Sequence, residues 1–280
     1  MFRLYRTTQG LMLEQAGAWV SPTSALTLDS LFQATAPLAL VQAAFATGRS
    51  IASPDSEWTL LAPLQSQEVW AAGVTYLRSK SARMAESKEA GGGSFYDRVY
   101  DAERPELFFK ATPHRVAAPG GEVRIRRDSR WNVPEPELTL ALNAAGQIFG
   151  YTIGNDMSSR DIEGENPLYL PQAKTYDLCA ALGPCLVITD TLPSPATAIA
   201  LEIRRSGRPV FQGETTVACI KRPLPSLADW LFRESSFPAG AYLMTGTGVI
   251  PPDDFTLAAG DEVRISLDPV GTLVNRVAAK

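Results

Sequence analysis

A run of residues from 135 to 142, Glu-Pro-Glu-Leu-Thr-Leu-Ala-Leu, alternates between two kinds of side chain. Leucine occupies positions 138, 140 and 142, whereas Glu137, Thr139 and Ala141 occupy the positions that alternate with them. A strand points successive side chains to opposite faces, so this period of two predicts a β-strand. Pro136 is compatible with the start or the edge of such a strand. Glu135 and Glu137 therefore leave the same face, a few ångströms apart.

Two carboxylates held this close repel each other, and each raises the pKa of the other. A cation between them removes this penalty. Hard oxygen ligands in this arrangement suit Mg²⁺, and they are also compatible with Mn²⁺ or Ca²⁺. The spacing alone leaves open a second interpretation, a solvated acidic strand edge, because short motifs often match by chance.

An acidic residue on the next segment strengthens the metal interpretation. The turn-like sequence Asn-Ala-Ala-Gly at 143–146 leads into an apolar run from 148, which predicts the return strand of a hairpin. Asp156 lies near the end of this run, where solvation explains a carboxylate poorly. Three carboxylates converging from one hairpin would form a single divalent site. Such sites for Mg²⁺ usually keep several waters and complete their coordination with substrate.

The composition excludes several other classes of protein. With 45% hydrophobic residues, 20% charged residues and a net charge of −4, the chain has an ordinary globular composition. No basic block favours nucleic acid or an anionic membrane, and no apolar run of about 18 residues predicts a membrane span. Three cysteines without a CxxC pair, and a start without a signal-peptide core, predict a cytoplasmic protein. His114 is the only histidine, which excludes a zinc site made of several histidines.

The order of the expected elements divides the chain into two units. Residues 1–65 combine short strands with a helical stretch over 28–47, which predicts a small N-terminal α/β domain. Strands dominate residues 66–280, where helices are expected only at 79–89 and 227–234. This pattern argues against a doubly wound parallel sheet. It predicts an α+β, mostly β chain whose larger domain is a rolled, mainly antiparallel β structure.

Several blocks in the second unit resemble the fumarylacetoacetate hydrolase superfamily. They are Glu-x-Glu at 135–137, GYTIGNDMSSRD at 150–161, QAKTYD at 172–177, LGP at 182–184 and TGTGVIPP at 245–252. The resemblance covers about residues 66–280 and implies a rolled β catalytic domain that assembles as a homodimer or homotetramer. It also implies a divalent ion held by three carboxylates, which map onto Glu135, Glu137 and Asp156.

The same resemblance implies which residues line the substrate pocket. The arginine of the long motif, the residue three positions beyond it and the lysine of QAKTYD would be Arg160, Glu163 and Lys174. The second threonine of TGTG, Thr247, would face the same pocket. From the residues alone, Arg160 could instead pair with a neighbouring carboxylate, Asp161 or Glu163.

One departure from the superfamily concerns the reaction. The carbon–carbon hydrolases of this superfamily share a His–Glu pair that activates the attacking water. This chain has Ser79 and Ala82 at the corresponding positions, and His114 lies elsewhere. A plain hydrolase would therefore lack an obvious base.

Two segments, 96–110 and 159–174, are similar to a narrower branch whose members dehydrate 2-keto-3-deoxy sugar acids. The branch implies a hydro-lyase that converts a 2-dehydro-3-deoxy pentonate, such as the D-arabinonate, to 2,5-dioxopentanoate in pentose catabolism. The partner would be a small-molecule 2-keto acid whose carboxylate and ketone oxygens complete the Mg²⁺ coordination. Arg78 and Ser79 would contact the sugar end of this substrate.

Lys174 is the first candidate for proton transfer, because a nearby metal and arginine lower the pKa of a lysine. A salt bridge to Asp156 or Asp177 is the structural alternative, and a Schiff base to the substrate ketone is a third interpretation. Glu106 is a candidate general acid, although a surface carboxylate is an equally good interpretation. Lys110 is a further candidate for contact with substrate.

Two other functions stay open from the sequence. An acylpyruvate-type C–C hydrolase or decarboxylase acts on a diketo acid with the same chelating head group, and the missing His–Glu pair disfavours it. A non-catalytic relative that binds sugar acids is disfavoured by the intact carboxylate trio together with Lys174.

Overall fold

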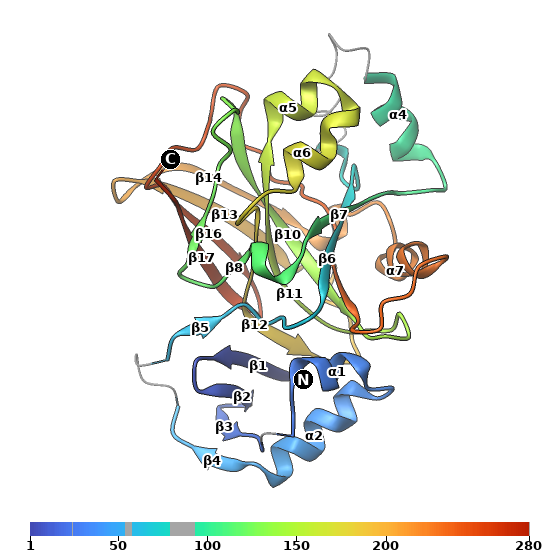
Figure 1. The fold of residues 1–280 in the computed structure, drawn as a ribbon, viewed down its shortest axis with the longest axis vertical. Coiled ribbons are helices and arrows are strands. Elements are labelled where there is room, and N and C mark those ends of the chain that lie inside the picture. Colours follow the sequence, from blue (N-terminus) through green and yellow to red (C-terminus); the bar gives the residue numbers. More distant parts are fainter. Residues whose placement is uncertain (24, 54–57, 79–92, 280) are drawn as a thin grey trace.

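The computed structural model describes residues 1–23, 25–53, 58–78 and 93–279, and its strands form two sheets (Figure 1). The larger sheet contains β1 (Phe2–Thr7), β2 (Gly10–Gln15), β3 (Ala18–Ser21), β4 (Arg49–Ile51), β5 (Leu60–Leu61), β6 (Glu68–Gly73), β7 (Glu106–Ala111), β8 (Val116–Ala117), β10 (Asn132–Leu142), β11 (Ile148–Ser159), β12 (Ala180–Ile188) and β15 (Ala241–Met244). The smaller sheet contains β9 (Glu122–Val123), β13 (Ala198–Arg205), β14 (Arg208–Thr216), β16 (Glu262–Leu267) and β17 (Gly271–Val277).

The strand order gives the rolled, mainly antiparallel architecture. The larger sheet runs β4-β3-β2-β1-β12-β11-β10-β15-β6-β7, with β5 beside β1 and β8 beside β12. The smaller sheet runs β14-β13-β16-β17-β9. Three pairs are parallel, β15 with β6, β12 with β8 and β17 with β9, and the other strand pairs among the described residues are antiparallel. The predicted mostly β fold is confirmed.

The acidic hairpin lies in the middle of the larger sheet, and both of its faces are covered. Every residue of β10 is buried, as are those of β11 from Phe149 onward. The leucines of β10 pack in one core with residues of the smaller sheet, including Leu201 and Ile265. Ala141 belongs to a second core on the opposite face of the strand, together with Leu4. The alternative of a solvated acidic edge is therefore wrong, because this strand is central and two cores enclose it.

The N-terminal strands continue the larger sheet, since β1 pairs with β12 through the register Leu4↔Leu186. The helical stretch expected at 28–47 is two helices, α1 (Leu28–Gln33) and α2 (Pro37–Thr47). Thr27 and Ser30 form a reciprocal capping box at the start of α1. Pro37 suits the first turn of the second helix, where its missing N–H costs no hydrogen bond. The domain division after residue 65 stays a prediction.

Further helices and 3₁₀ turns of the described residues connect the strands. They are α4 (Gly93–Asp101), α5 (Arg160–Glu165), α6 (Leu170–Lys174) and α7 (Leu224–Phe232), with 3₁₀ turns η1 (Pro113–Arg115), η2 (Pro167–Tyr169) and η3 (Val217–Cys219). Both α5 and α6 lie at the end of the molecule opposite the N-terminal strands (Figure 1). The helix expected at 79–89 falls outside the described residues. None of the helices that the structure describes is long and apolar enough to cross a membrane.

Candidate metal centre and active site

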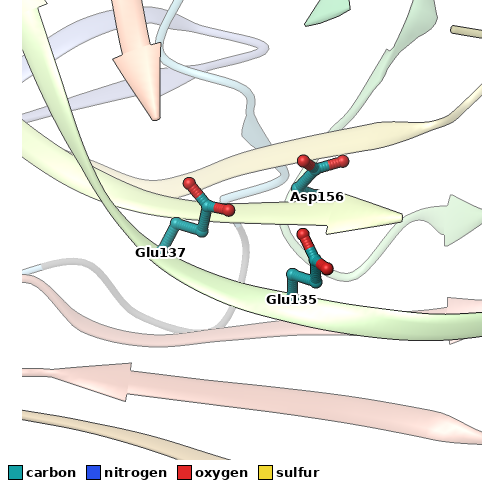
Figure 2. Close-up of side chains that lie close together, drawn as sticks. All are labelled: Glu135, Glu137 and Asp156. Atoms are coloured by element: carbon teal, nitrogen blue, oxygen red, sulfur yellow. The ribbon is translucent and has the colours of Figure 1, made fainter. Parts of the chain in front are cut away.

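The hairpin brings the three predicted carboxylates together. Glu135 and Asp156 are directly opposite each other in the β10–β11 register, and Glu137 follows two residues along the same strand. Each residue offers one carboxylate oxygen, and these oxygens all lie within 4.8 Å of one another. The three side chains project from the two strands toward a common centre (Figure 2). All three residues are buried: the exposed fraction is 5% for Glu135, 2% for Glu137 and 1% for Asp156.

Glu137 shows that the cluster suits a further cation. Burial raises the pKa of this carboxyl well above its usual value, and the nearby charges of Asp156 and Glu135 raise it further. The backbone N–H of Gly246 donates to Glu137 Oε2 over 2.6 Å, which offsets only part of this cost. A divalent ion among the oxygens would remove the repulsion, and an all-oxygen donor set is the kind that Mg²⁺ prefers. The three carboxylates therefore fit a magnesium ion.

Lys174, the last residue of α6, points its ammonium between two of the three carboxylates. Its Nζ donates to Glu135 Oε2 over 2.6 Å and to Asp156 Oδ2 over 3.0 Å. It also donates to the Ser158 hydroxyl over 2.5 Å, and Glu163 Oε1 lies 3.4 Å away. The salt bridge to Asp156 that the sequence left open is therefore present, and it forms inside the acidic cluster.

Arg160 approaches the cluster from the end of β11. Its Nη2 donates to Glu135 Oε1 over 2.5 Å, and its Nε lies 4.0 Å from Glu163 Oε2. Both Arg160 and Glu163 are about 1% exposed. Asp161, the other partner considered from the sequence, instead accepts hydrogen bonds from the Ser129 hydroxyl and the backbone N–H of Arg130. Asp161 thus fixes the chain beside the site.

Lys110 of β7 reaches the same cluster from the other side of Asp156. Its Nζ lies 2.6 Å from Asp156 Oδ1 and donates to the carbonyl of Met157 over 2.9 Å. It also donates to the carbonyl of Lys174. The buried cluster therefore combines the carboxylates of Glu135, Glu137, Asp156 and Glu163 with the cations of Lys110, Arg160 and Lys174.

The other predicted residues lie in different surroundings. Glu106 is half-buried on β7 with its carboxylate against Gly73, and a side chain at Gly73 would collide with it. Thr247 is buried, and its hydroxyl hydrogen-bonds the backbone of Val249. Arg78 is exposed, so the structure does not bring its side chain into the buried cluster. Ser79 lies outside the described residues.

Ser158 and Gly246 contact the cluster but were not predicted to belong to it. Ser158 stands two residues after Asp156 on β11, so the same period of two that linked the glutamates could have placed its hydroxyl on the metal face. Gly246 has φ +92, and a side chain there would collide with Thr75. Its contact with Glu137 depends on the approach of a distant segment, which no spacing in the sequence indicates.

The family model described as fumarylacetoacetate (FAA) hydrolase C-terminal matches residues 69–278, which include every residue of the cluster. The chain belongs to the fumarylacetoacetate hydrolase family. The predicted family membership is therefore confirmed.

Two curated members of the family are similar to this chain. A protein of Haloferax volcanii named probable 2-keto-3-deoxyxylonate dehydratase is 45% identical over 216 residues, 77% of this chain and 73% of that protein. The 2-dehydro-3-deoxy-D-arabinonate dehydratase of Saccharolobus solfataricus is 42% identical over 218 residues, again 77% and 73% of the two chains.

A solved structure of this fumarylacetoacetate hydrolase fold covers the whole chain. It is described as 2-keto-3-deoxy-D-arabinonate dehydratase complexed with magnesium and 2,5-dioxopentanoate, and it aligns with a TM-score of 0.83 and 32% identity. The alignment covers 100% of this chain and 98% of the other.

Mg²⁺ binding should strengthen as the pH rises, and it should release a proton from Glu137. The folded-state pKa of Glu137 is raised above 4.5, so the metal-free protein keeps this carboxyl protonated over a window in which the unfolded chain has already lost the proton. By the same linkage, the free energy of unfolding of the metal-free protein should fall as the pH rises through that window. Calorimetric Mg²⁺ titrations in two buffers of different ionisation enthalpy measure the number of protons released on binding. Equal heats in both buffers at mildly acidic pH would contradict the assignment.

Proposed function

We propose that this chain is a hydro-lyase that dehydrates a 2-keto-3-deoxy pentonate, such as 2-dehydro-3-deoxy-D-arabinonate, to 2,5-dioxopentanoate in pentose catabolism. The observation that carries the proposal is the buried carboxylate trio with Lys174 between Glu135 and Asp156. That arrangement stands in a chain 42–45% identical to two proteins named as dehydratases of this substrate class.

Glu135, Glu137 and Asp156 would hold the divalent ion. A bound Mg²⁺ supplies a Lewis acid that polarises the C2 ketone and makes the C3 proton more acidic. Magnesium is the favoured ion because the solved neighbour is described as a magnesium complex. Mn²⁺ and Ca²⁺ also take oxygen ligands.

The reaction needs a base at C3 and an acid at the C4 hydroxyl. Loss of a C3 proton and of the C4 hydroxide as water leaves an enone, and a proton shift from C5 to C3, with the C5 hydroxyl proton passing to C4 through solvent, gives the terminal aldehyde. Lys174 carries its proton beside two carboxylates, so its ammonium is suited to donate to the departing hydroxyl. This role needs an ammonium and differs from a Schiff base, which needs the neutral amine.

Glu106 is the candidate base for C3, in place of the general-acid role expected from the sequence, because Lys174 would supply the acid. Glu106 and Phe108 lie two residues apart on β7 and share one face of that strand, and Lys110 lies at the register shift that follows. Lys174 Nζ lies 5.7 Å from the centre of the Phe108 ring, and Lys110 contacts Asp156, so this face of β7 is turned toward the cluster. A half-buried carboxylate on that face is suited to accept a proton.

Arg160, with Glu163 beside it, would orient the substrate. The guanidinium is buried and already fixed by Glu135, so it presents a positive charge at the edge of the trio where an α-keto carboxylate would bind. Thr247 and Arg78 stay proposals as further pocket residues, and Ser79 stays a prediction. The homodimer or homotetramer and the cytoplasmic location also stay predictions.

The direct test incubates the purified protein and Mg²⁺ with 2-keto-3-deoxy-D-arabinonate and, separately, with its D-xylonate-derived counterpart. We expect an aldehyde proton signal to appear by NMR and to vanish when EDTA removes the ion. An acylpyruvate serves as the comparison substrate. Cleavage of the acylpyruvate without dehydration of either pentonate would favour the hydrolase alternative, whose required histidine the exposed His114 on η1 does not supply.

A further inference from the structure

The Lys110 ammonium is buried among three oxygen atoms of the protein. The side chain is 0% exposed, and an ammonium has three N–H donors. Two of them go to the Met157 carbonyl at 2.9 Å and to the Lys174 carbonyl, and the ammonium also lies 2.6 Å from Asp156 Oδ1 in an ion pair. The substrate contact predicted for Lys110 stays a prediction, and the structure places its ammonium against Asp156.

The position of this ammonium is fixed by parts of the fold other than the carboxylates. Two of its acceptors are backbone carbonyls, one on β11 and one at the C-terminal end of α6. Neither carbonyl can move by a change of side-chain rotamer. Lys110 is thus a rigid point charge placed behind Asp156, and it holds one oxygen of that carboxylate in place.

Each carboxylate oxygen of Asp156 contacts one lysine ammonium. Lys110 takes Oδ1 and Lys174 takes Oδ2. The Lys174 ammonium also contacts Glu135 Oε2, so Oδ2 is the oxygen on the Glu135 side of the carboxylate. Oδ2 is therefore the oxygen shared with Lys174 on the Glu135 side, and Oδ1 is ion-paired with Lys110.

We propose that Lys110 is a positioning residue that keeps Asp156 a one-oxygen metal ligand and so favours Mg²⁺ and Mn²⁺ over Ca²⁺. Mg²⁺ requires near-octahedral coordination with short bonds, whereas Ca²⁺ accepts six to eight oxygens and often takes both oxygens of one carboxylate. Holding Oδ1 away from the ion withholds the extra ligand that Ca²⁺ would use. This inference rests on the proposed role of the trio as a metal site.

The experiment compares ion affinities of the metal-free wild type with those of Lys110→Met, which keeps the length of the side chain and removes its donors. Isothermal titration with Mg²⁺ and with Ca²⁺, without substrate, gives two association constants for each protein. Loss of the Lys110 charge changes the affinity for both dications alike. The ratio of the two association constants therefore reports how many oxygens of Asp156 bind the ion. We expect the Ca²⁺/Mg²⁺ ratio to rise about tenfold, a size typical of changes next to a ligand.

Lys221→Met is the matched control, since Lys221 pairs with Asp101 away from the cluster, and it should leave the ratio unchanged. An unchanged ratio in a folded Lys110→Met protein would overturn the inference, even if both affinities fell together. Failure of the wild type to bind either ion would instead overturn the proposed metal site.

Crystals of the wild type grown with Ca²⁺ test the same point without a substitution, should Lys110→Met fail to fold. We expect Asp156 to reach the ion through Oδ2 alone, with Lys110 still on Oδ1. A Ca²⁺ ion bound by both oxygens of Asp156 would contradict the positioning role.

Discussion

Glu135→Gln and Asp156→Asn should each lower kcat/KM for the proposed dehydration on the order of a thousandfold. Each change removes a negative charge from the trio that would hold the ion, and electrostatic groups at a reacting centre commonly contribute this much. Each also removes the charged partner of buried cations. Arg160 and Lys174 lose the charge of Glu135, whereas Lys174 and Lys110 lose that of Asp156. Steady-state rates of aldehyde formation, with Mg²⁺ titrations of the same samples, measure both effects.

Glu202→Gln on β13 is the matched control for these substitutions. Glu202 forms an ion pair with Arg204 on the smaller sheet, outside the acidic cluster, so this variant should keep its activity and its Mg²⁺ affinity. A circular dichroism spectrum and a thermal midpoint for each variant separate loss of the ion from loss of the fold. Full activity of Glu135→Gln, or of wild type stripped of metal, would refute the metal-assisted reaction.

Lys174→Met should lower kcat by about 10²–10⁴-fold, the range for loss of a general acid or base, while the protein still binds Mg²⁺. In the structure the ammonium occupies Glu135 Oε2 and Asp156 Oδ2, which are oxygens that the ion would also use. Removing this competing charge should leave the Mg²⁺ affinity unchanged or higher. A large loss of kcat together with retained metal binding distinguishes proton transfer from a purely structural salt bridge.

Two comparisons sharpen the test of Lys174. Lys221→Met again serves as the control for a lysine-to-methionine change, and it should keep full activity. Borohydride added during turnover tests the Schiff base, because it reduces an imine to a stable covalent adduct. We expect no adduct on the wild type. An adduct that is absent from Lys174→Met would show that this lysine acts as a nucleophile.

The period of two was enough to predict the hairpin and the face that its carboxylates share. The structure places Glu135 opposite Asp156 through a register shift between Ala141 and Leu142, which the turn at 143–146 does not indicate. The spacing could not decide whether this face was solvated, because the pattern of an edge strand and that of a central strand can be the same. Burial on both sides follows from the smaller sheet and from the N-terminal strands, which are distant in the sequence.

Lys110 illustrates what local sequence cannot indicate. It lies 46 residues before Asp156 and 64 before Lys174, and it meets them only because β7 and α6 come together at the end of the hairpin. A lysine beside a ligand can contact the substrate or hold the ligand. The choice depends on how many of its donors the surrounding backbone takes, and this is known only once the chain is folded.

By itself, the sequence determined the strand, the shared face of Glu135 and Glu137, and the family to which the chain belongs. These properties depend on residues close together in the chain or on motifs several residues long. Only the tertiary structure decided that the carboxylates are buried and which cation meets each oxygen. Desolvation and ion pairing depend on segments brought together by the order of the strands, and no local pattern encodes that order.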